Sequence, residues 1–401
     1  MPASQRALNW IVQYILRPLG QILLFVVLSS VVMSLVAIGI SLLLRSDWHG
    51  IDLLRVRPRT DLFETTLRLL PNILVDGISV GFLYAVIALG YTMVYGVLRF
   101  INFAHSEIFM VGGVIGFEVL MLLNHGAEGG ALESLSPVLV ILAMLLAAML
   151  FSGGLAVVVE RVAYKPLRNA PKLVPLISAI GVSLLLQDLV RATQELRRGA
   201  FNMPYPLDDF MKFAAVNRQG KAIQVPFLQQ RVPLIGDVST NMTTVVIVIS
   251  AILMVLALNY FVNATKLGKG IRAVSQDQTT ASLMGINVNQ MITLTFLIGG
   301  ALGGAAGVLF GLKVSNISPY IGFAPGLKAF TAAVLGGIGN ITGALLGGLL
   351  LGLIEAFFSS LLPSFPALGT GYTDIFAFSV LILVLLFRPS GLLGKREDEK
   401  V

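Results

Sequence analysis

Long apolar runs recur along this chain, and they limit the folds it can adopt more than any other feature. Nine of them lie at residues 21–44, 73–98, 108–124, 137–159, 173–190, 243–262, 291–312, 341–362 and 372–387. A helix needs about twenty apolar residues to cross the hydrocarbon core of a bilayer. Charged residues make up only 12% of the 401 positions, whereas a soluble domain carries roughly 25%. We therefore expect an all-α, polytopic integral membrane protein without a large soluble domain.

One further apolar segment is too short to cross a bilayer as an ordinary helix. The apolar core of residues 322–340 is about thirteen residues long, compared with the roughly twenty that a span needs. We expect a half-helix or a re-entrant element here. If the segment reaches across, the chain has ten spans and both termini lie in the cytoplasm. If it is re-entrant, the count falls to nine, so the sequence predicts about nine or ten transmembrane or re-entrant helices.

Two basic loops predict which side of the membrane the span ends face. Residues 161–172 contain four Lys or Arg and no acidic residue, and residues 266–272 contain three more basic side chains. Because Lys and Arg are enriched in short cytoplasmic loops, we place both loops in the cytoplasm. The polar segment at 191–240 then lies on the opposite side, although it holds seven Lys or Arg. Long loops follow the charge rule poorly, so this conflict is acceptable.

The segment at 266–287 joins two apolar runs and is predicted to meet a cytoplasmic partner. After its basic start comes a polar turn, then a short amphipathic pattern that ends at a glycine. Glycine often ends a helix because it adopts the left-handed conformation without strain. A short helix tethered between two spans is well placed to be pushed by another protein; the alternative is an ordinary solvated loop. The candidate contact residues are Arg272, Asp277, Ala281 and Gly285.

Glycines recur at every fourth position in the run at 291–312. They are Gly299, Gly303, Gly307 and Gly311. At 3.6 residues per turn this spacing forms one slowly drifting stripe, on which a second helix can pack closely. The rival interpretation is a flexible, unwound segment, but the Leu, Ile and Phe residues between the glycines favour a helix.

The sequence lacks the residues that most enzyme classes require. It contains no cysteine, and its three histidines (His49, His105 and His125) are far apart, so we expect neither a thiol nucleophile nor a metal site. The nucleotide-binding pattern GxxxxGK[ST] does not occur, nor do HExxH and GxSxG. We therefore expect no enzyme and no cofactor, but a conduit whose energy comes from another protein.

Four stretches of the chain resemble permeases for branched-chain amino acids in bacterial ATP-binding-cassette (ABC) importers. They are ALGYTMVYGVLRFINFAHSEIFMVGG at 88–113, ERVAYKPLR at 160–168, RAVSQDQTTASLMGIN at 272–287 and SPYIGFAPGLKAFTAAVLGGIGNITGALLGG at 318–348. The resemblance covers roughly residues 70–394. One departure is Ser106, where the family usually has glycine, and this change could alter the turn there.

The resemblance implies an inner-membrane permease subunit that pairs with a second, related permease. Two cytoplasmic ATP-binding subunits would drive it through the 266–287 segment, and a periplasmic binding protein would deliver an amino acid, branched-chain or otherwise hydrophobic. The chain would then divide into an extension with one extra span and a polar connector (1–69), the permease domain (70–394) and a charged cytoplasmic tail (395–401). Urea or a short amide is an alternative substrate. An ion-coupled secondary transporter and a passive channel are alternative classes of protein.

Polar residues within the apolar runs are candidates for a translocation path. Ionisable side chains are costly inside a membrane and tend to face a cavity or a partner. Lys328 and Glu355 lie deepest and supply the opposite charges that a zwitterion would need, although a structural ion pair between them is an equal alternative. Asn102 and His105 lie at a break in the helical pattern and complete the predicted path. Asp374 falls near a predicted span end, where we expect contact with interfacial water.

Overall fold

The computed structural model is predominantly helical. It describes residues 9–43, 62–125, 136–168, 170–171, 173–199, 203–204, 212–216, 222–234, 238–364, 370–388 and 390–394. Within these residues, eight helices are long and apolar enough to cross a membrane. They are Asn9–Gly39, Phe63–Leu98, His105–Leu123, Pro137–Leu167, Leu173–Arg197, Met242–Ala264, Val288–Val314 and Ile341–Ser364. The predicted all-α, polytopic membrane architecture is confirmed.

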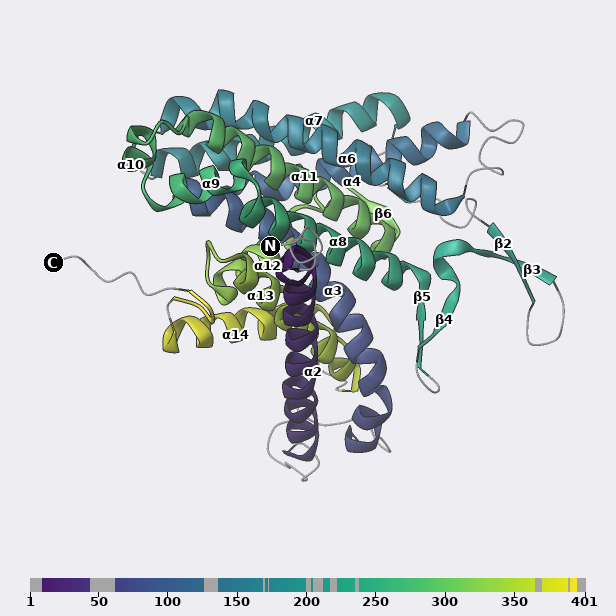
Figure 1. Ribbon diagram of the computed structural model, residues 1–401. Coiled ribbons are helices and arrows are strands. Elements are labelled where there is room, and N and C mark those ends of the chain that lie inside the picture. The colour runs from purple at the N-terminus through teal and green to yellow at the C-terminus, as the bar shows by residue number, and fades with distance from the viewer. Residues whose placement is uncertain are drawn as a thin grey trace.

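The elements follow one another from an amino-terminal helix to a short carboxy-terminal one (Figure 1). The α-helices are α2 (Arg17–Leu43), α3 (Leu62–Leu98), α4 (His105–His125), α6 (Pro137–Val159), α7 (Leu173–Arg198), α8 (Met242–Ala264), α9 (Lys266–Gln276), α10 (Gln278–Leu283), α11 (Val288–Val314), α12 (Phe323–Gly336), α13 (Ile341–Leu361) and α14 (Thr373–Phe387). A π-helical turn, η1 (Val12–Leu16), leads into α2, and another, η3 (Glu160–Tyr164), continues α6.

Short strands occur among the described residues between α7 and α8 and after α11. They are β1 (Met203–Pro204), β2 (Lys212–Val216), β3 (Ala222–Pro226), β4 (Arg231–Pro233), β5 (Ser239–Asn241) and β6 (Asn316–Ile317). Three antiparallel pairs form, β1 with β6, β2 with β3 and β4 with β5. The long polar segment at 191–240 thus contains small hairpins, which the sequence analysis did not predict.

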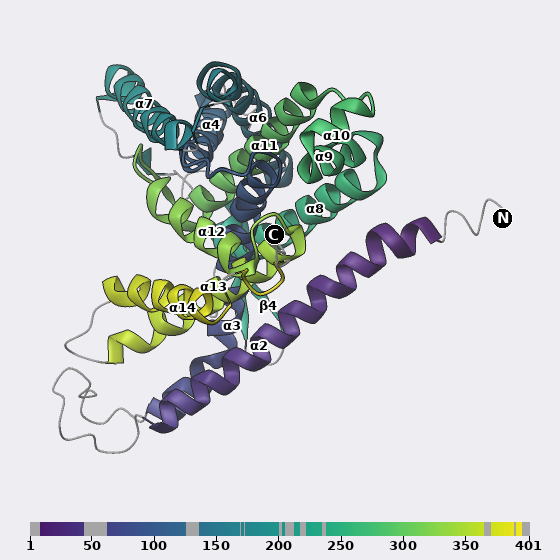
Figure 2. The ribbon, with the colours of Figure 1, turned by 90° about the vertical axis from the view of Figure 1, so that its left-hand side faces the viewer.

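The centre of the molecule is α11, which packs against α3, α4 and α6. Figure 2 shows α11 beside α4 and α6, while α13 lies between α12 and α3. Most α11 residues are buried, on all sides of the helix, as expected for a helix in the core of a membrane protein. By contrast, α7 contacts chiefly α4 and η3, and many of its leucines are exposed.

The short segment predicted at 322–340 forms α12, a helix of 14 residues. At 1.5 Å per residue it is about 21 Å long, less than the thickness of the hydrocarbon core. Before α12, the carboxy-terminal end of α11 (at Ser315) lines one cavity together with β4 and β5. After α12, the start of α13 lines a second cavity together with α9. These two cavities lie at opposite ends of the helix bundle, with α9 and the β4–β5 hairpin far apart (Figure 1). The half-helix together with the chain before it therefore reaches from one end of the bundle to the other.

Two predicted boundaries were wrong. The second span was expected to begin at residue 73 after a polar connector, but α3 already begins at Leu62 and contains Pro71. Likewise, the fifth span was expected to end at residue 190, but α7 continues to Arg198. Residues 191–198 are mostly Ala, Gln, Glu, Leu and Arg, which favour helix whether or not they are apolar. Hydropathy locates the membrane-crossing part of a helix but not its solvated ends.

The amino-terminal helix α2 lies across the direction of α6, α7 and α11 (Figure 1). It packs on α3 and α13, and its first turns reach the end of α8. There, Trp10 and Tyr14 contact the ring of Tyr260 edge-on, with centroid distances of 5.5 and 5.8 Å. The far tail predicted at 395–401 lies outside the described residues.

Candidate functional site

Charged side chains from three helices meet between α12, α13 and α14. Lys328 Nζ lies 3.0 Å from Glu355 Oε1 and 2.7 Å from Asp374 Oδ1. The hydroxyl of Tyr84, on α3, donates a hydrogen bond of 2.7 Å to Glu355 Oε2. The side chain of Lys328 is only 11% exposed, whereas that of Asp374 is 46% exposed, so the cluster has one open side. Buried charges in a membrane are tolerated when they are paired in this way.

The structure adds an ion pair that the sequence analysis did not predict for Asp374. The residue lies in the first turn of α14, a helix of only 15 residues. Its side chain is 46% exposed, in keeping with the expected contact with water, and it also binds Lys328 directly.

The two other predicted path residues lie in a separate place. Asn102 Oδ1 accepts a hydrogen bond of 2.6 Å from the hydroxyl of Tyr164, and both residues are buried. His105 is 1% exposed, and its ring lies edge-on to Tyr91 with a centroid distance of 4.7 Å. Among the described contacts, nothing joins this pair to Lys328. The structure thus brings together Lys328 and Glu355, but places Asn102 and His105 in packed interior.

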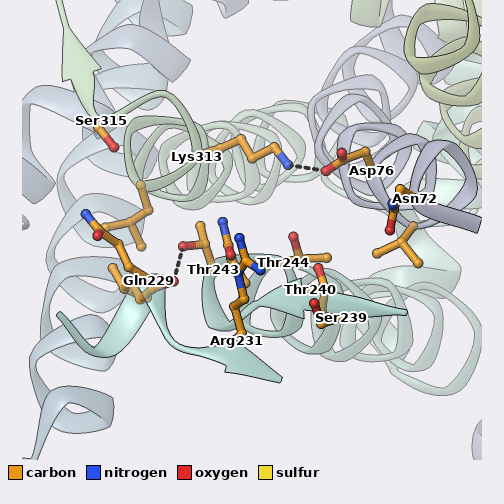
Figure 3. A pocket seen from close by; sticks show the side chains of 14 residues that line it. Asn72, Asp76, Gln229, Arg231, Ser239, Thr240, Thr243, Thr244, Lys313 and Ser315 are labelled. Atoms are coloured by element: carbon orange, nitrogen blue, oxygen red, sulfur yellow. Dashed lines mark hydrogen bonds and ion pairs between the residues drawn. The ribbon is translucent and has the colours of Figure 1, made fainter. Parts of the chain in front are cut away.

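A cavity of about 880 Å³ opens where α3, α8 and α11 meet the β4–β5 hairpin. We call it the β4–β5 cavity. Figure 3 shows an ion pair across it, in which Lys313 Nζ lies 3.1 Å from Asp76 Oδ1, and it shows Arg231 extending inward from β4. Thr243, at the start of α8, donates a hydrogen bond of 2.9 Å to the carbonyl of Leu228. The cavity is polar and carries charges of both signs.

Sequence reasoning missed the residues of the β4–β5 cavity. Asp76 and Lys313 are 237 positions apart, and each lies near the end of an apolar run, where a charge usually needs no partner. Only the topology brings them together, because α3 and α11 run side by side in opposite directions. The pairing could not be read from local pattern.

A second cavity, of about 680 Å³, lies at the other end of α3 and α8. We call it the α9 cavity, because Arg272 and Ser275 of α9 line it together with Arg99 and Asn340. Helices α3 and α8 therefore each run from the polar β4–β5 cavity at one end of the molecule to the α9 cavity at the other. The order of the chain puts the predicted cytoplasmic loop at the α9 cavity.

The segment at 266–287 folds into two short helices, each started by a side-chain cap. Thr265 accepts a hydrogen bond of 3.0 Å from the amide of Gly268, and Asp277 accepts one of 2.6 Å from the amide of Thr280. Caps of this kind satisfy amide groups that a helix start leaves without partners. Gly285 follows α10 with φ of 82°, so the predicted short helix closed by a glycine is confirmed in its geometry.

The predicted contact residues of this segment face different ways. Ala281 is 4% exposed and points into the protein, so it anchors α10 rather than presenting it. The Arg272 side chain donates to Asn263 Oδ1 at 3.2 Å. Instead, the exposed tip consists of Leu283 and Met284, which are 83% and 78% exposed. Two large apolar side chains exposed side by side are typical of a surface that another protein covers.

The same segment is fastened to the end of α3. Gln278 Nε2 donates a hydrogen bond of 2.9 Å to the carbonyl of Val97, and Arg99 donates one of 3.1 Å to the carbonyl of Ser275. These two hydrogen bonds join α9 and α10 to α3, the helix that lines both cavities.

The glycines of α11 lie against neighbouring helices at very short range. A Cβ atom added at Gly307 would lie 2.0 Å from the carbonyl oxygen of Phe109 on α4, and one at Gly299 would lie 3.3 Å from the carbonyl oxygen of Gly90 on α3. One at Gly303 would lie 3.1 Å from the ring of His105. Gly311 is buried in the last turn. Gly307 therefore has no room for a side chain, whereas at Gly299 and Gly303 a Cβ atom would require only small shifts of α3 and of the His105 ring.

Comparison with known proteins identifies the family. The profile described as "Branched-chain amino acid transport system / permease component" matches residues 73–385. The high-affinity branched-chain amino acid transport system permease protein BraD of Pseudomonas aeruginosa is 43% identical over 329 residues, which cover 82% of this chain and 97% of that protein. The corresponding permease LivH of Escherichia coli K12 is 40% identical over 331 residues, covering 81% and 96%. A probable LivH of Methanocaldococcus jannaschii is 27% identical over 318 residues, covering 78% and 89%.

The similarity to these membrane permeases is consistent with the eight long apolar helices. Together they identify the chain as a multi-pass protein of a bacterial inner membrane. The residues matched by the family profile include the four stretches that carry the sequence resemblance. The chain belongs to the family of permease components of branched-chain amino acid transport systems.

Proposed function

We propose that this chain is the permease subunit of an ABC importer that moves branched-chain amino acids from a periplasmic binding protein into the cytoplasm. The observation that carries the proposal is the identity of 43% and 40% to two permeases of high-affinity branched-chain amino acid systems, over nearly their whole length. A related permease would complete the membrane part of the transporter.

ATP would be hydrolysed by cytoplasmic subunits that contact α9 and α10. The exposed pair Leu283 and Met284 would insert into the ATP-binding subunit, since their apolar surface has no partner within the described part of this chain. Asp277 and Gly285 would fix the shape of the tip, Ala281 would hold it to the bundle, and Arg272 would brace α9. Under this proposal, the chain itself has no catalytic role.

The route would run from the β4–β5 cavity, on the periplasmic side, toward the α9 cavity on the cytoplasmic side. Lys328 and Glu355 remain candidates for this route, because the open side of their cluster lets a zwitterion exchange partners with them. Asn102 and His105 would take part only if α3, α4 and α11 separate, since both are enclosed.

Uptake by the reconstituted transporter tests the proposal. Proteoliposomes would contain this chain, its partner permease and the ATP-binding subunits, with the binding protein outside and ATP inside. We expect uptake of labelled leucine that requires ATP, persists when ionophores abolish ion gradients, and is competed by isoleucine and valine. Uptake that collapses with the ion gradient would favour a secondary transporter, and competition by urea or acetamide would favour the amide alternative.

A further inference from the structure

A polar pocket of about 390 Å³ lies between the start of α2, the end of α8 and α9. We call it the α2–α9 pocket, because Arg17 of α2 and Arg272 of α9 both line it. Asn259 and Asn263, in the last turns of α8, line it as well. The family profile begins at residue 73, so one side of this pocket comes from a part of the chain that the profile does not match.

The two positive charges in this pocket have no negative partner. Among the described residues that line it, none is acidic, and neither Arg17 nor Arg272 forms an ion pair with a described carboxylate. An arginine stays protonated at physiological pH and offers five N–H donors in a planar fork. Arg272 uses one of its donors on Asn263 Oδ1, at 3.2 Å, so most of the guanidinium donors remain for an acceptor from outside.

The two asparagines of α8 are oriented so that they add donors. Because arginine can only donate, the side-chain oxygen of Asn263 must face Arg272. The amide nitrogen of Asn263 then donates to Asn259 Oδ1, which leaves Nδ2 of Asn259 as a further donor. Cations and amide donors together favour an anion with several oxygen atoms, such as a phosphate.

The pocket also carries the marks of a membrane surface on the predicted cytoplasmic side. Tyr14 lines it, and the rings of Tyr14 and Trp10 lie edge-on to Tyr260, with centroid distances of 5.8 and 5.5 Å. Tryptophan and tyrosine are enriched where a membrane meets water, and the basic residues of the 266–272 loop place α9 in the cytoplasm. Basic pockets between membrane helices on that side bind the head groups of anionic lipids.

The side of α2 that bears Arg17 continues into an exposed apolar stripe. Gln21, Leu24 and Leu28 follow Arg17 at intervals of four, three and four residues, which keep them on one side of a helix. Leu24 is 54% exposed and Leu28 is 51% exposed. Figure 2 shows α2 on the outer side of the bundle, away from α4, α6 and α7. A charged pocket that continues into an apolar stripe fits an amphiphile better than a soluble anion.

We propose that the α2–α9 pocket binds the phosphate of an anionic phospholipid from the cytoplasmic leaflet. Arg17 and Arg272 hold the phosphate from two different helices, and the acyl chains lie along Leu24 and Leu28. The lipid thereby joins the amino-terminal extension to the segment that, under the proposed function, contacts the ATP-binding subunit. This site does not depend on which solute the permease carries.

Quenching of tryptophan fluorescence by brominated lipid chains tests the proposal directly. The chain has two tryptophans, Trp10 and Trp48, and replacing both by phenylalanine removes the background signal. Leu24→Trp then places the one remaining tryptophan on the apolar stripe. Leu146→Trp, on α6, is the matched control, because Leu24 and Leu146 are similarly exposed (54% and 52%). Each full-length variant is reconstituted in vesicles, and quenching is compared between brominated phosphatidylglycerol and brominated phosphatidylcholine.

We expect phosphatidylglycerol to be preferred over phosphatidylcholine at position 24 but not at position 146. Arg17→Gln and Arg272→Gln should each lower this preference about fivefold, which is the effect of one basic residue near anionic lipid. Lys269→Gln should leave it unchanged, because Lys269 is an exposed residue of α9 that does not line the pocket. Equal preference at the two positions, or an equal loss in Lys269→Gln and Arg17→Gln, would overturn the inference.

A soluble phosphate compound is the other source of the same chemistry, and one further measurement distinguishes it. Chloride is exchanged for inorganic phosphate at constant ionic strength, with Leu24→Trp as the reporter. Quenching by brominated phosphatidylglycerol should not change, because the acyl chains hold the lipid at the site. Displacement of the lipid by inorganic phosphate would assign the pocket to a soluble phosphate compound and overturn the assignment to a lipid.

Discussion

Replacing Gly307 by alanine should weaken the packing of α11 against α4. The added Cβ atom would lie 2.0 Å from the carbonyl oxygen of Phe109 and 2.6 Å from the amide nitrogen of Gly113. Both are backbone atoms, so no rotamer change can relieve the contact. Restoring an ordinary contact of about 3.4 Å would require the helices to separate by roughly 1.4 Å, which loses dispersion contacts along the interface.

The expected cost is about 1–3 kcal/mol, the usual range for an overpacked core. Alanine also favours helix over glycine by about 1 kcal/mol, and this gain appears in a control without the clash. Gly181→Ala is such a control, because Gly181 lies within α7 and has no atom within 4 Å of an added Cβ. The two variants should therefore differ by about 2 kcal/mol in free energy of unfolding, or roughly thirtyfold in the folded-to-unfolded ratio.

Unfolding of the purified chain in mixed micelles, followed by circular dichroism, measures this difference. Gly307→Ala should unfold at a lower fraction of denaturing detergent than the unmodified chain, and Gly181→Ala at the same fraction or a higher one. Identical unfolding of the two variants would refute the packing argument. A comparison of Gly303→Leu with Leu302→Ala would be less informative, because Leu302 is 4% exposed and its truncation costs about 2–5 kcal/mol on its own.

Three further predictions concern coupling, charge and the amino-terminal extension. Gly285→Val should uncouple ATP hydrolysis from uptake while the protein still inserts, because valine strongly disfavours φ of 82°; normal uptake with normal ATPase stimulation would contradict this. Lys328→Met alone leaves Glu355 and Asp374 without their cation, so the yield of folded protein should fall more than in the double variant with Glu355→Gln. If the pair also lines the route, both variants should lose uptake, and recovery of uptake in the double variant would limit the pair to structure. Removal of residues 1–69 should leave a core that assembles and transports, and loss of uptake in a truncated protein that inserts normally would show a further role for the extension.

Much of the fold could be predicted because it depends on local pattern. Runs of apolar residues predicted the spans, the short run at 322–340 predicted the half-helix α12, and Gly285 predicted the end of α10. Each of these depends on residues within one or two turns. The ends of α3 and α7 were predicted less well, since a helix continues past the membrane wherever its residues have sufficient helix propensity.

The candidate sites could be predicted only in part, because they depend on contacts between distant residues. The pairing of Lys328 with Glu355 was one of two predicted alternatives, but the addition of Asp374 depends on how α14 packs against α12 and α13. The inward position of Ala281 and the exposed tip at Leu283 and Met284 follow from the angle at which α10 meets the bundle. The angle between α10 and the bundle depends on many weak contacts between distant residues. It therefore cannot be predicted from a short sequence motif.

The glycine contacts also bear on how the permease moves. A Cβ atom at Gly347 would lie 2.0 Å from the carbonyl oxygen of Ala332, and one at Gly352 would lie 2.2 Å from the amide nitrogen of Gly81, so α13 is held to α12 and to α3 as tightly as α11 is held to α4. Packed interfaces of this kind do not deform continuously. Under the proposed function, a push on Met284 would therefore turn the bundle as one body rather than open a passage within it, and access would alternate at an outer surface of the bundle. On this view, a residue on the route must lie at an outer face of the bundle, whereas His105 is enclosed.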